Sequence, residues 1–489
     1  MIYLRMVLGE LFPYAYAVFY VFTALYAITT IACIIVVVSE NRNPVRSLAW
    51  VMVLLLLPVV GILIYFFFGR SLKNVIMITR NNRMSLRVQN SLDSIDPSTL
   101  QLTDSSRQLI RLVNALVEPH FLTGNEIEVL TEGAQKFDRL KADLLSATSY
   151  INFQYYIFSA DTIGQEIADI LMQKAREGVK VRVIYDHVGS WSIASSFFKR
   201  MRKAGVEAYP FLKVSFPQLA NRLNWRNHRK VVVIDGKVGY IGGMNVADRY
   251  VTGEKGYRAW RDTHLRIEGS AVKGLQFSFA VDWNFMKHTL LQQPCPAPVP
   301  DSPAARQMGM QIVSSGPTQP HNAMSMVMLR AISLAKKCIY IQTPYFLPEE
   351  SMMAALHSAS LSGVDVRIMI PLYPDSKILK YSSLSYVKEC LVSGIRVYLY
   401  TARMLHAKCV MIDDEFVTTG STNFDFRSFE HNFECNALIY NRQFCEQMKQ
   451  IFYHDAQSGC VEMTIEQWVK RPLRERALES MSRLLGPIL

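Results

Sequence analysis

Two stretches of the sequence, NHRKVVVIDG at 227–236 and LHAKCVMIDD at 405–414, repeat one pattern of residues able to do chemistry. The pattern is His-x-Lys-x4-Asp, and its members are His228, Lys230 and Asp235 in the first copy and His406, Lys408 and Asp413 in the second. Side chains two positions apart on a strand point to the same face, so we expect each histidine to stand beside its lysine. The aliphatic residues that follow predict a buried strand that holds the pair rigidly, with the aspartate at its end.

Each copy continues to a stretch of small residues at a matched distance. GGMN ends at Asn245 and GSTN ends at Asn423, each 17 residues after the histidine of its copy. Small residues let backbone and amide groups approach a bound anion closely, and Ser421 adds a hydroxyl in the second copy only. A single copy would fit a polar strand edge equally well, but two copies with the same internal spacing favour a phosphate-binding site.

Two further carboxylates, Asp262 and Glu434, lie 34 and 28 residues after the histidine of their own copy. A carboxylate that accepts a hydrogen bond from one ring nitrogen of a histidine fixes the tautomer and stabilises the imidazolium. We expect Asp262 and Glu434 to orient the motif histidines, and the alternative for each is a surface or structural role.

Two histidines and two lysines suit the cleavage of a phosphodiester. One imidazole can attack phosphorus while the other protonates the departing oxygen, because the unperturbed pKa of histidine is about 6.5. The lysines would hold the negative charge of the non-bridging oxygens. A covalent phosphohistidine divides the reaction into two steps, and the second acceptor can be water or an alcohol. No ligand spacing in the sequence requires a metal, so we expect neither a metal nor another cofactor.

The elements that must position these residues predict an α/β fold made of two similar halves. Apolar strands alternate with helical patterns at 150–158, 162–176 and 179–185, which is typical of α/β layers. The segments YINFQYYIF, REGVKVRVIYD and KAGVEAYPF return later, in the same order, as IYIQTPYFL, LSGVDVRIMIP and VSGIRVYLY. We therefore expect a linker at 74–120, a first half at 121–290, a proline-rich linker at 291–305 and a second half at 306–489, packed as a pseudo-dimer.

The N-terminal 73 residues predict a transmembrane hairpin. Residues 11–39 and 47–69 contain no charged side chain, and each stretch exceeds the length of about 20 apolar residues that spans a bilayer. The short connection carries two arginines, Arg42 and Arg46. The other ends carry six basic residues: Arg5, Arg70, Lys73, Arg80, Arg83 and Arg87. Because basic residues prefer the cytoplasmic side, we expect a multi-pass protein of the cell membrane with its large body in the cytoplasm.

The composition of the chain agrees with a membrane setting. Of 489 residues 50% are hydrophobic, and the net charge is +12, which suits an anionic membrane surface, a phosphate-bearing substrate or nucleic acid. No basic stripe with interleaved aromatic residues favours nucleic acid, so we expect no such partner. The eight cysteines form no C-x-x-C pair, and we expect them to be reduced. The tail at 472–489 mixes arginines with leucines, as an interfacial amphipathic helix or a docked terminal helix would.

The duplicated motif with its Asn-ended tail resembles the phospholipase D superfamily. The apolar N-terminus, GNEIEVLTEG, YYIFSADTIGQEIADIL, KAREGVKVRVIYDHVGS and GSTNFDFRSFEHNFE are similar to the bacterial cardiolipin synthase family over essentially the whole chain. The resemblance implies one active site where the two motifs meet. It implies that two phosphatidylglycerol molecules in the bilayer are condensed to cardiolipin and glycerol.

The same resemblance implies a role for each motif residue. His228 would be the nucleophile, and His406 the general acid and later the base. The phosphate would be held by Lys230, Lys408, Asn245 and Asn423. Asp235 and Asp413 would position the strand end rather than touch phosphorus. Because GGMN lacks the hydroxyl that Ser421 supplies, the halves are unequal, and the order in which the histidines act stays open.

Three alternatives remain at the level of sequence. The first is a hydrolase or head-group exchange enzyme acting on another phospholipid, since the motif residues do not select the acceptor. The second is a membrane-tethered nucleic-acid-binding protein, and the third is an inactive scaffold, which two intact motifs disfavour. Protein partners and oligomeric state are not indicated.

Overall fold

The computed structural model divides the chain into two units, residues 1–72 with 214–224 and residues 73–213 with 225–489. It describes residues 2–39, 44–57, 59–65, 69, 75–89, 100–118, 121–214, 224–254 and 258–484. Arg42, Arg70 and Lys73, which contributed to the predicted orientation of the hairpin, lie outside these residues.

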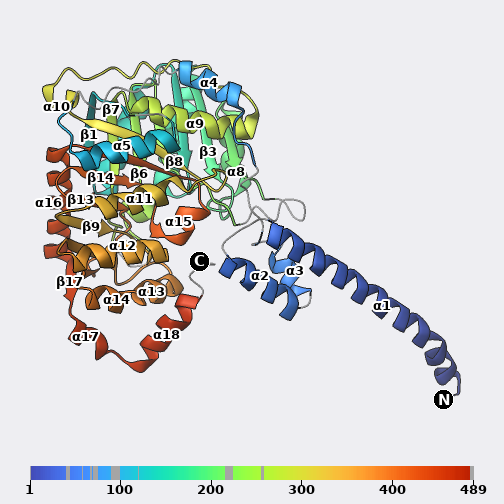
Figure 1. Ribbon diagram of the computed structural model, residues 1–489. Helices are drawn as coiled ribbons and strands as arrows, with labels where there is room; N and C mark the ends of the chain where they lie inside the picture. The colour runs from blue at the N-terminus through green and yellow to red at the C-terminus, as the bar shows by residue number, and fades with distance from the viewer. Residues whose placement is uncertain are drawn as a thin grey trace. The chain divides into compact units, whose positions relative to one another are not determined.

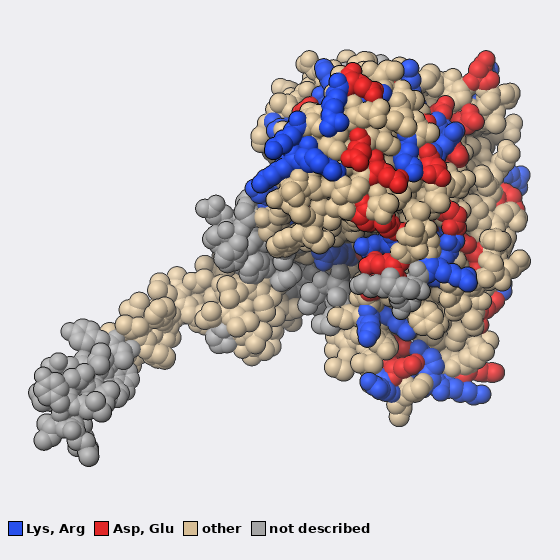
Figure 2. All heavy atoms as spheres, turned by 180° about the vertical axis from the view of Figure 1, so that it is seen from behind, with Lys and Arg blue, Asp and Glu red and all other residues tan. Residues whose placement is uncertain are grey.

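The N-terminal unit is helical, with α1 (Ile2–Ser39), α2 (Pro44–Leu56) and α3 (Val60–Ile64). Within the described residues one helical segment, Ala17–Ser39, is long and apolar enough to cross a membrane, with a mean hydropathy of 2.5. On the face seen in Figure 2, the part of this unit that is not grey is tan throughout, without a Lys, Arg, Asp or Glu side chain. The α1 and α2 helices pack together, and the hydroxyl of Tyr26 donates to the carbonyl of Leu54 at 2.9 Å. The two-helix hairpin expected from the sequence is not confirmed, because α2 ends at Leu56 and the next helix among the described residues, α3, has five residues.

The large unit contains two β-sheets, drawn in cyan to green and in yellow to red in Figure 1, which share one strand order except that the second sheet has the additional edge strand β17. The first sheet has the order β1-β7-β6-β5-β2-β3-β4 and the second has β8-β16-β14-β13-β9-β11-β12-β17. In the first sheet β2 is parallel to β3 and antiparallel to β5. In the second sheet β9 is likewise parallel to β11 and antiparallel to β13. The two repeated halves predicted from the sequence are therefore confirmed.

The strands of the first sheet are β1 (Asn125–Leu130), β2 (Tyr150–Tyr155), β3 (Lys180–Asp186), β4 (Glu207–Phe211), β5 (Val231–Ile234), β6 (Val238–Gly242) and β7 (His264–Gly269). The strands of the second are β8 (Gly309–Ser315), β9 (Cys338–Gln342), β11 (Asp365–Pro371), β12 (Arg396–Tyr400), β13 (Cys409–Ile412), β14 (Phe416–Gly420), β16 (Glu434–Tyr440) and β17 (Cys460–Met463). A separate pair is formed by β10 (Phe346–Leu347) and β15 (Phe424–Asp425).

The helices of the large unit alternate with these strands. Before and within the first half they are α4 (Arg80–Gln89), α5 (Asp104–Leu116), α6 (Gly133–Ser146), α7 (Thr162–Arg176), α8 (Ser195–Lys203), the 3-10 helix η4 (Asp248–Tyr250) and α9 (Val272–Lys287). After it come α10 (Pro303–Arg306), α11 (Ala323–Leu334), α12 (Glu350–Leu361), α13 (Lys377–Leu384), α14 (Val387–Val392), α15 (Phe426–Glu430), α16 (Arg442–Gly459), α17 (Ile465–Val469) and α18 (Leu473–Leu484).

The inner faces of the two sheets share one apolar core. Val231 and Val233 of β5 belong to the same buried cluster as Cys409 and Met411 of β13, together with side chains of α9 and α16. A second cluster fills the space between the first sheet and α6, α7 and α8, and a third lies between the second sheet and α5, α11, α12 and α14. Packing of the inner faces against each other brings β5 and β13, and so the two motifs, into one interior.

One helix lies where the sequence predicts it, and another lies where the sequence predicts a linker. The helix predicted at 162–176 is α7, and it is followed by Gly178 in the left-handed conformation with φ of +93°, where glycine meets no steric penalty. The linker expected at 74–120 is wrong for 104–116, because α5 forms there. Its apolar side chains Leu109, Ile110 and Val113 are buried in the core of the second half.

Candidate active site

Each motif histidine lies at the entrance of a central strand rather than within it. His228 and Lys230 immediately precede β5, and His406 precedes β13. The backbone of each entrance bonds to the opposite half. The amide of His228 donates to the carbonyl of Phe433 at 2.9 Å, and the amide of His406 donates to the carbonyl of Arg261 at 2.6 Å. Both histidines are thus fixed by the seam between the halves.

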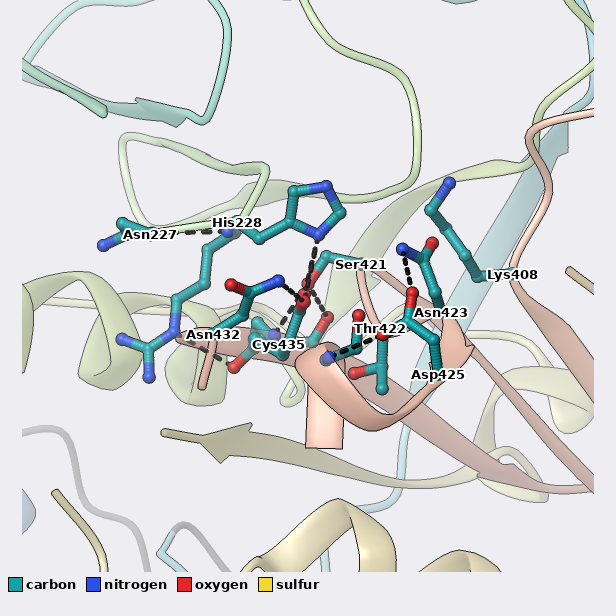
Figure 3. Close-up of polar contacts among 12 residues, drawn as sticks. Asn227, His228, Lys408, Ser421, Thr422, Asn423, Asp425, Asn432 and Cys435 are labelled. Atoms are coloured by element: carbon teal, nitrogen blue, oxygen red, sulfur yellow. Dashed lines mark hydrogen bonds and ion pairs between the residues drawn. The ribbon is translucent and has the colours of Figure 1, made fainter. Parts of the chain in front are cut away.

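Phe433 and Arg261, which accept these two bonds, are each followed by a carboxylate residue, Glu434 and Asp262. Each carboxylate contacts the histidine of the opposite half. Nδ1 of His228 donates to Glu434 of the other half, 3.0 Å from each carboxylate oxygen. Nδ1 of His406 lies 2.6 Å from Oδ2 of Asp262. Figure 3 shows the second ring nitrogen of His228 pointing away from this contact. The sequence places each carboxylate behind the histidine of its own copy, but the fold gives it to the histidine of the other copy.

Aromatic rings enclose the two imidazoles. The ring of Tyr156 meets that of His228 edge to face, with centroids 4.9 Å apart. Trp260 lies 5.3 Å from the His406 ring, and the hydroxyl of Tyr250 is 3.3 Å from Nδ1 of His406. These rings limit the rotation of the histidines and exclude water from their buried sides.

The ammonium groups of both motif lysines are turned toward their own histidines. Nζ of Lys230 donates to the carbonyl of His228, and Nζ of Lys408 donates to the carbonyl of His406. Nζ of Lys408 also lies 2.8 Å from Nδ1 of His406. Both lysines are buried, and burial lowers the pKa of Lys408 to about 8 and the pKa of Lys230 well below its usual value. Burial therefore disfavours the charge of each lysine, and Glu434 and Asp262 oppose this effect.

The small-residue tails bring both asparagines to the site. Asn245 accepts from the amide of Ile157 and donates to the hydroxyl of Tyr250, both at 3.2 Å. Nδ2 of Asn423 donates to Asp425 at 3.0 Å (Figure 3), and its Oδ1 is buried with no hydrogen-bond partner among the described residues. Ser421 instead lies beneath the site, where its hydroxyl accepts from the amide of Cys435 at 2.9 Å.

Asp235 and Asp413 lie at the far ends of β5 and β13 from the histidines. Asp235 accepts from the amides of Thr148, Ser149 and Tyr150, each at 2.8 Å. Asp413 accepts from the matching amides at residues 336–338, at 2.7 to 3.2 Å. Both aspartates have a φ of +52°. They hold the neighbouring strand against the motif strand and touch no part of the histidine pocket.

The electrostatics leave the resting site with neutral imidazoles and an ionised Glu434. Burial lowers the pKa of His406 to about 4, assisted by the charge of Lys408 and opposed by Asp262. Burial likewise lowers the pKa of His228, against the opposing charge of Glu434. Although burial alone would raise it, the pKa of Glu434 is lowered by His228 and Lys230. Each neutral ring then donates Nδ1–H to its carboxylate and keeps a lone pair on Nε2.

His228 and His406 line one cavity of about 950 Å³, open mouth included. The cavity is also lined by Asn245, Asn423, three arginines (Arg226, Arg249 and Arg427) and two acidic residues (Asp375 and Asp425). Arg226 is itself paired with the buried Asp186 at 3.2 Å. A cavity lined by two imidazoles and three arginines is suited to a phosphodiester anion.

The cavity contains functional candidates that the sequence interpretation missed. Arg249 and Arg427 each lie four residues after the motif asparagine, in GGMNVADR and GSTNFDFR, and this matched spacing could have revealed them. Tyr156 lies in YINFQYYIF, which the duplication already singled out. Trp260 and Asp375 lie in segments without a matched pattern, so no signal in the sequence pointed to them. Among the described residues no group of three or more His, Cys, Asp and Glu side chains is arranged to hold a metal ion.

Comparison with known proteins places this arrangement in a family. The family described as "Cardiolipin synthase, PLD-like domain" matches residues 140–271 and 328–456, and "Phospholipase_D-nuclease N-terminal" matches residues 28–70. The major cardiolipin synthase ClsA of Bacillus subtilis (strain 168) is 38% identical over 472 residues, which cover 95% of this chain and 98% of that protein. A cardiolipin synthase of Geobacillus kaustophilus (strain HTA426) is 38% identical over 471 residues, covering 96% of this chain and 94% of the other.

A solved structure agrees with these matches at the level of the fold. The phosphatidylserine synthase of Haemophilus influenzae Rd KW20 superposes with a TM-score of 0.60 at 16% identity, covering 79% of this chain and 100% of that one. The sequence matches extend over nearly the full length of both partners, and they include both motifs. The chain belongs to the cardiolipin synthase family of phospholipase D-like proteins.

Proposed function

We propose that this protein transfers a phosphatidyl group from one phosphatidylglycerol to a second, giving cardiolipin and glycerol. The observation that carries the proposal is the pair of crossed histidine–carboxylate contacts, His228 with Glu434 and His406 with Asp262, at a single cationic cavity. Two such pairs supply one group to attack phosphorus and another to handle the proton of the alcohol on the opposite side. The named relatives act as cardiolipin synthases, which supports phosphatidylglycerol as both donor and acceptor.

In the first step Nε2 of His228 attacks phosphorus of the donor lipid, and a P–N bond replaces the P–O bond to glycerol. The departing glycerol oxygen takes a proton from His406. His406 is neutral in the empty site because its pKa is lowered to about 4, so it must gain that proton as the phosphodiester anion binds. The negative charge of the anion raises the pKa of a nearby imidazole, and Asp262 stabilises the imidazolium.

In the second step the glycerol hydroxyl of another phosphatidylglycerol gives its proton to His406. Its oxygen attacks phosphorus, the P–N bond breaks, and His228 is regenerated with cardiolipin as the product. The positive charge of Lys230, Lys408, Arg249 and Arg427 offsets the charge that builds up on the non-bridging oxygens. Glu434 and Asp262 hold the rings with Nε2 toward phosphorus, and Asp235 and Asp413 position the motif strands.

The N-terminal unit would keep the enzyme beside its lipid substrate. We propose that α1 spans the bacterial cell membrane and that α2 with α3 returns through it, leaving the two halves, near 121–290 and 306–489, in the cytoplasm. A tether of this kind raises the effective concentration of the site at the surface. Labelling of single cysteines introduced at either end of α1, in intact cells and in inverted vesicles, tests the orientation.

The central experiment is lipid mass spectrometry in a bacterial host that lacks its own cardiolipin synthases. The intact chain is expected to produce cardiolipin and to release glycerol. His228→Ala and His406→Ala are each expected to abolish the product while the protein stays in the membrane fraction. Phosphatidic acid in place of cardiolipin would mean that water is the acceptor, and an unchanged lipid profile would refute both forms of the reaction.

A further inference from the structure

The C-terminal helix α18 is attached to the body by its polar face. Glu479, only 6% exposed, accepts from Arg471 at 2.6 and 2.9 Å. The carbonyl of Ser482 accepts from the hydroxyl of Ser382 of α13 at 2.9 Å. Arg483 completes this face, since its guanidinium pairs with Glu389 and lies over the ring of Tyr386. Figure 1 shows α18, in red, beside α13.

The opposite face of α18 is apolar and points outward. Leu473, Met481 and Leu484 are 77%, 67% and 80% exposed, and the exposed Ala477 lies among them. With about 100° of rotation per residue, these four positions form one stripe. The exposed Arg474 and Arg476 lie on its two sides. A helix docked only for stability buries its apolar side, and α18 does the reverse.

The helix that carries α18 also forms part of the active-site wall. Leu379 of α13 lines the cavity that contains both motif histidines, as does Asp375 just before this helix. The neighbouring Lys377 and Ile378 are exposed, Ile378 to 47%. The apolar stripe of α18 is therefore only one helix away from the cavity.

We propose that α18 lies on the surface of a bilayer that contains anionic phospholipid, and that it holds this wall of the cavity against the membrane. An apolar stripe between arginines is the arrangement that enters the boundary between head groups and acyl chains while pairing with lipid phosphates. This surface goes beyond the proposed function and relies on it only for the nature of the substrate. It provides a second attachment, independent of α1, next to the place where lipid must enter.

Position 477, at the centre of the stripe, gives a direct test. Ala477→Cys is labelled with the fluorophore NBD in the full chain, in a Cys33→Ser/Cys460→Ser background that leaves the six buried cysteines in place. The protein is reconstituted into vesicles of phosphatidylcholine with phosphatidylglycerol, and acyl-brominated lipid is the quencher. Leu361→Cys, at a 74% exposed position of α12, is the matched control. We expect strong quenching at 477 and none at 361, and less quenching at 477 when phosphatidylglycerol is omitted.

Kinetics provide a second readout with matched variants. Leu473→Ser/Leu484→Ser removes the stripe, whereas Leu361→Ser/Val392→Ser removes two apolar side chains of similar exposure, 74% and 69%, elsewhere on the body. The first variant is expected to raise the apparent KM, expressed as the mole fraction of phosphatidylglycerol in the bilayer, several-fold, with a smaller change in kcat. The second variant is expected to behave as the parent protein.

Absent quenching at 477, equal quenching at the two positions, or equal kinetics of the two double variants would each overturn the proposal. If the fluorophore became shielded from water as the protein concentration rose, without quenching by lipid, the stripe would bind a second copy of the chain. This result would also overturn the proposal. The quenching does not depend on turnover. A quenched helix in a protein that makes no cardiolipin would contradict the proposed function alone.

Discussion

Nδ1 of His228 is bonded to the carboxylate of Glu434, at 3.0 Å, although the two residues belong to different halves of the chain. His406 and Asp262 repeat this contact in the opposite direction. Backbone bonds from His228 to Phe433 and from His406 to Arg261 set up both contacts. Each half thus supplies the imidazole of one pair and the carboxylate of the other, so that neither half contains a complete histidine–carboxylate pair.

The crossed pairing predicts which histidine responds to each carboxylate. Glu434→Gln is expected to lower the pKa of His228 further, because the charge of Glu434 opposes the effect of burial. Asp262→Asn is expected to do the same to His406. Nuclear magnetic resonance of chain labelled with carbon-13 at the histidine ring follows both titrations. Each variant should also lose about 10²- to 10⁴-fold in turnover. If Glu434→Gln changed the pKa of His406 rather than that of His228, the assignment of Glu434 to His228 would be refuted.

The parts of the site whose residues are close together in the chain could be predicted from the sequence. His228 with Lys230, and His406 with Lys408, are neighbours across two positions, and the duplication identified them as a unit. The two halves could likewise be predicted, because strand and helix patterns recur in the same order. The contacts between Glu434 and His228 could not, because they depend on how the inner faces of two sheets pack, which no spacing along the chain records.

The sequence interpretation missed two further features, α5 and Lys136, because a polar residue or segment does not reveal whether it is buried in the fold. The polar stretch before residue 120 hides α5, whose three buried apolar side chains cover the second half. Lys136 is fully buried, with Nζ 3.7 Å from the centre of the Phe137 ring and no hydrogen-bond partner among the described residues. A lysine in an amphipathic helix is ordinarily taken as solvent-exposed. Nothing in the sequence around Lys136 indicates otherwise.

The buried neutral imidazole of His406 predicts a loss of stability in acid. Its pKa is about 4 in the folded chain and about 6.5 when unfolded. Above the unfolded value both states are neutral, and the stability is fully present. As the pH falls from about 6.5 to about 4 only the unfolded chain binds the proton, which removes up to about 3 kcal/mol of the free energy of unfolding. His406→Gln should therefore lose less of its Tm between pH 7 and pH 4.5 than the parent protein in detergent micelles.

A substitution at the exposed His321 provides the control for this measurement. His321→Gln, which replaces a histidine on the surface and outside the cavity, should retain the pH dependence of Tm of the parent protein. An identical decline of Tm in His406→Gln and the parent protein would show that the His406 imidazole is not the group that resists protonation.

The aspartates at the strand ends predict a stability defect rather than a chemical one. Asp235→Ala leaves the amides of Thr148, Ser149 and Tyr150 without their acceptor, and it places alanine at a φ of +52°. A loss of about 2–3 kcal/mol in the free energy of unfolding is expected. Asp235→Asn should cost less, since asparagine keeps an acceptor and tolerates this φ. Turnover of the folded fraction should fall far less than in His228→Ala, and an abolished turnover at unchanged Tm would contradict this assignment.

The matched arginines Arg249 and Arg427 predict a defect in substrate binding. Both line the cavity, and a guanidinium offers paired donors that suit a phosphate. Arg249→Ala and Arg427→Ala should each raise the KM for phosphatidylglycerol by about 10- to 100-fold, equivalent to about 1.4–2.7 kcal/mol. The lysine variants keep the positive charge but lose the paired donors of the guanidinium, so their KM should lie between that of the alanine variants and that of the parent protein. Arg330→Ala, on the exposed side of α11, should leave KM unchanged. If both alanine variants kept the parent KM, the phosphate would have to be held by Lys230, Lys408 and the asparagines alone.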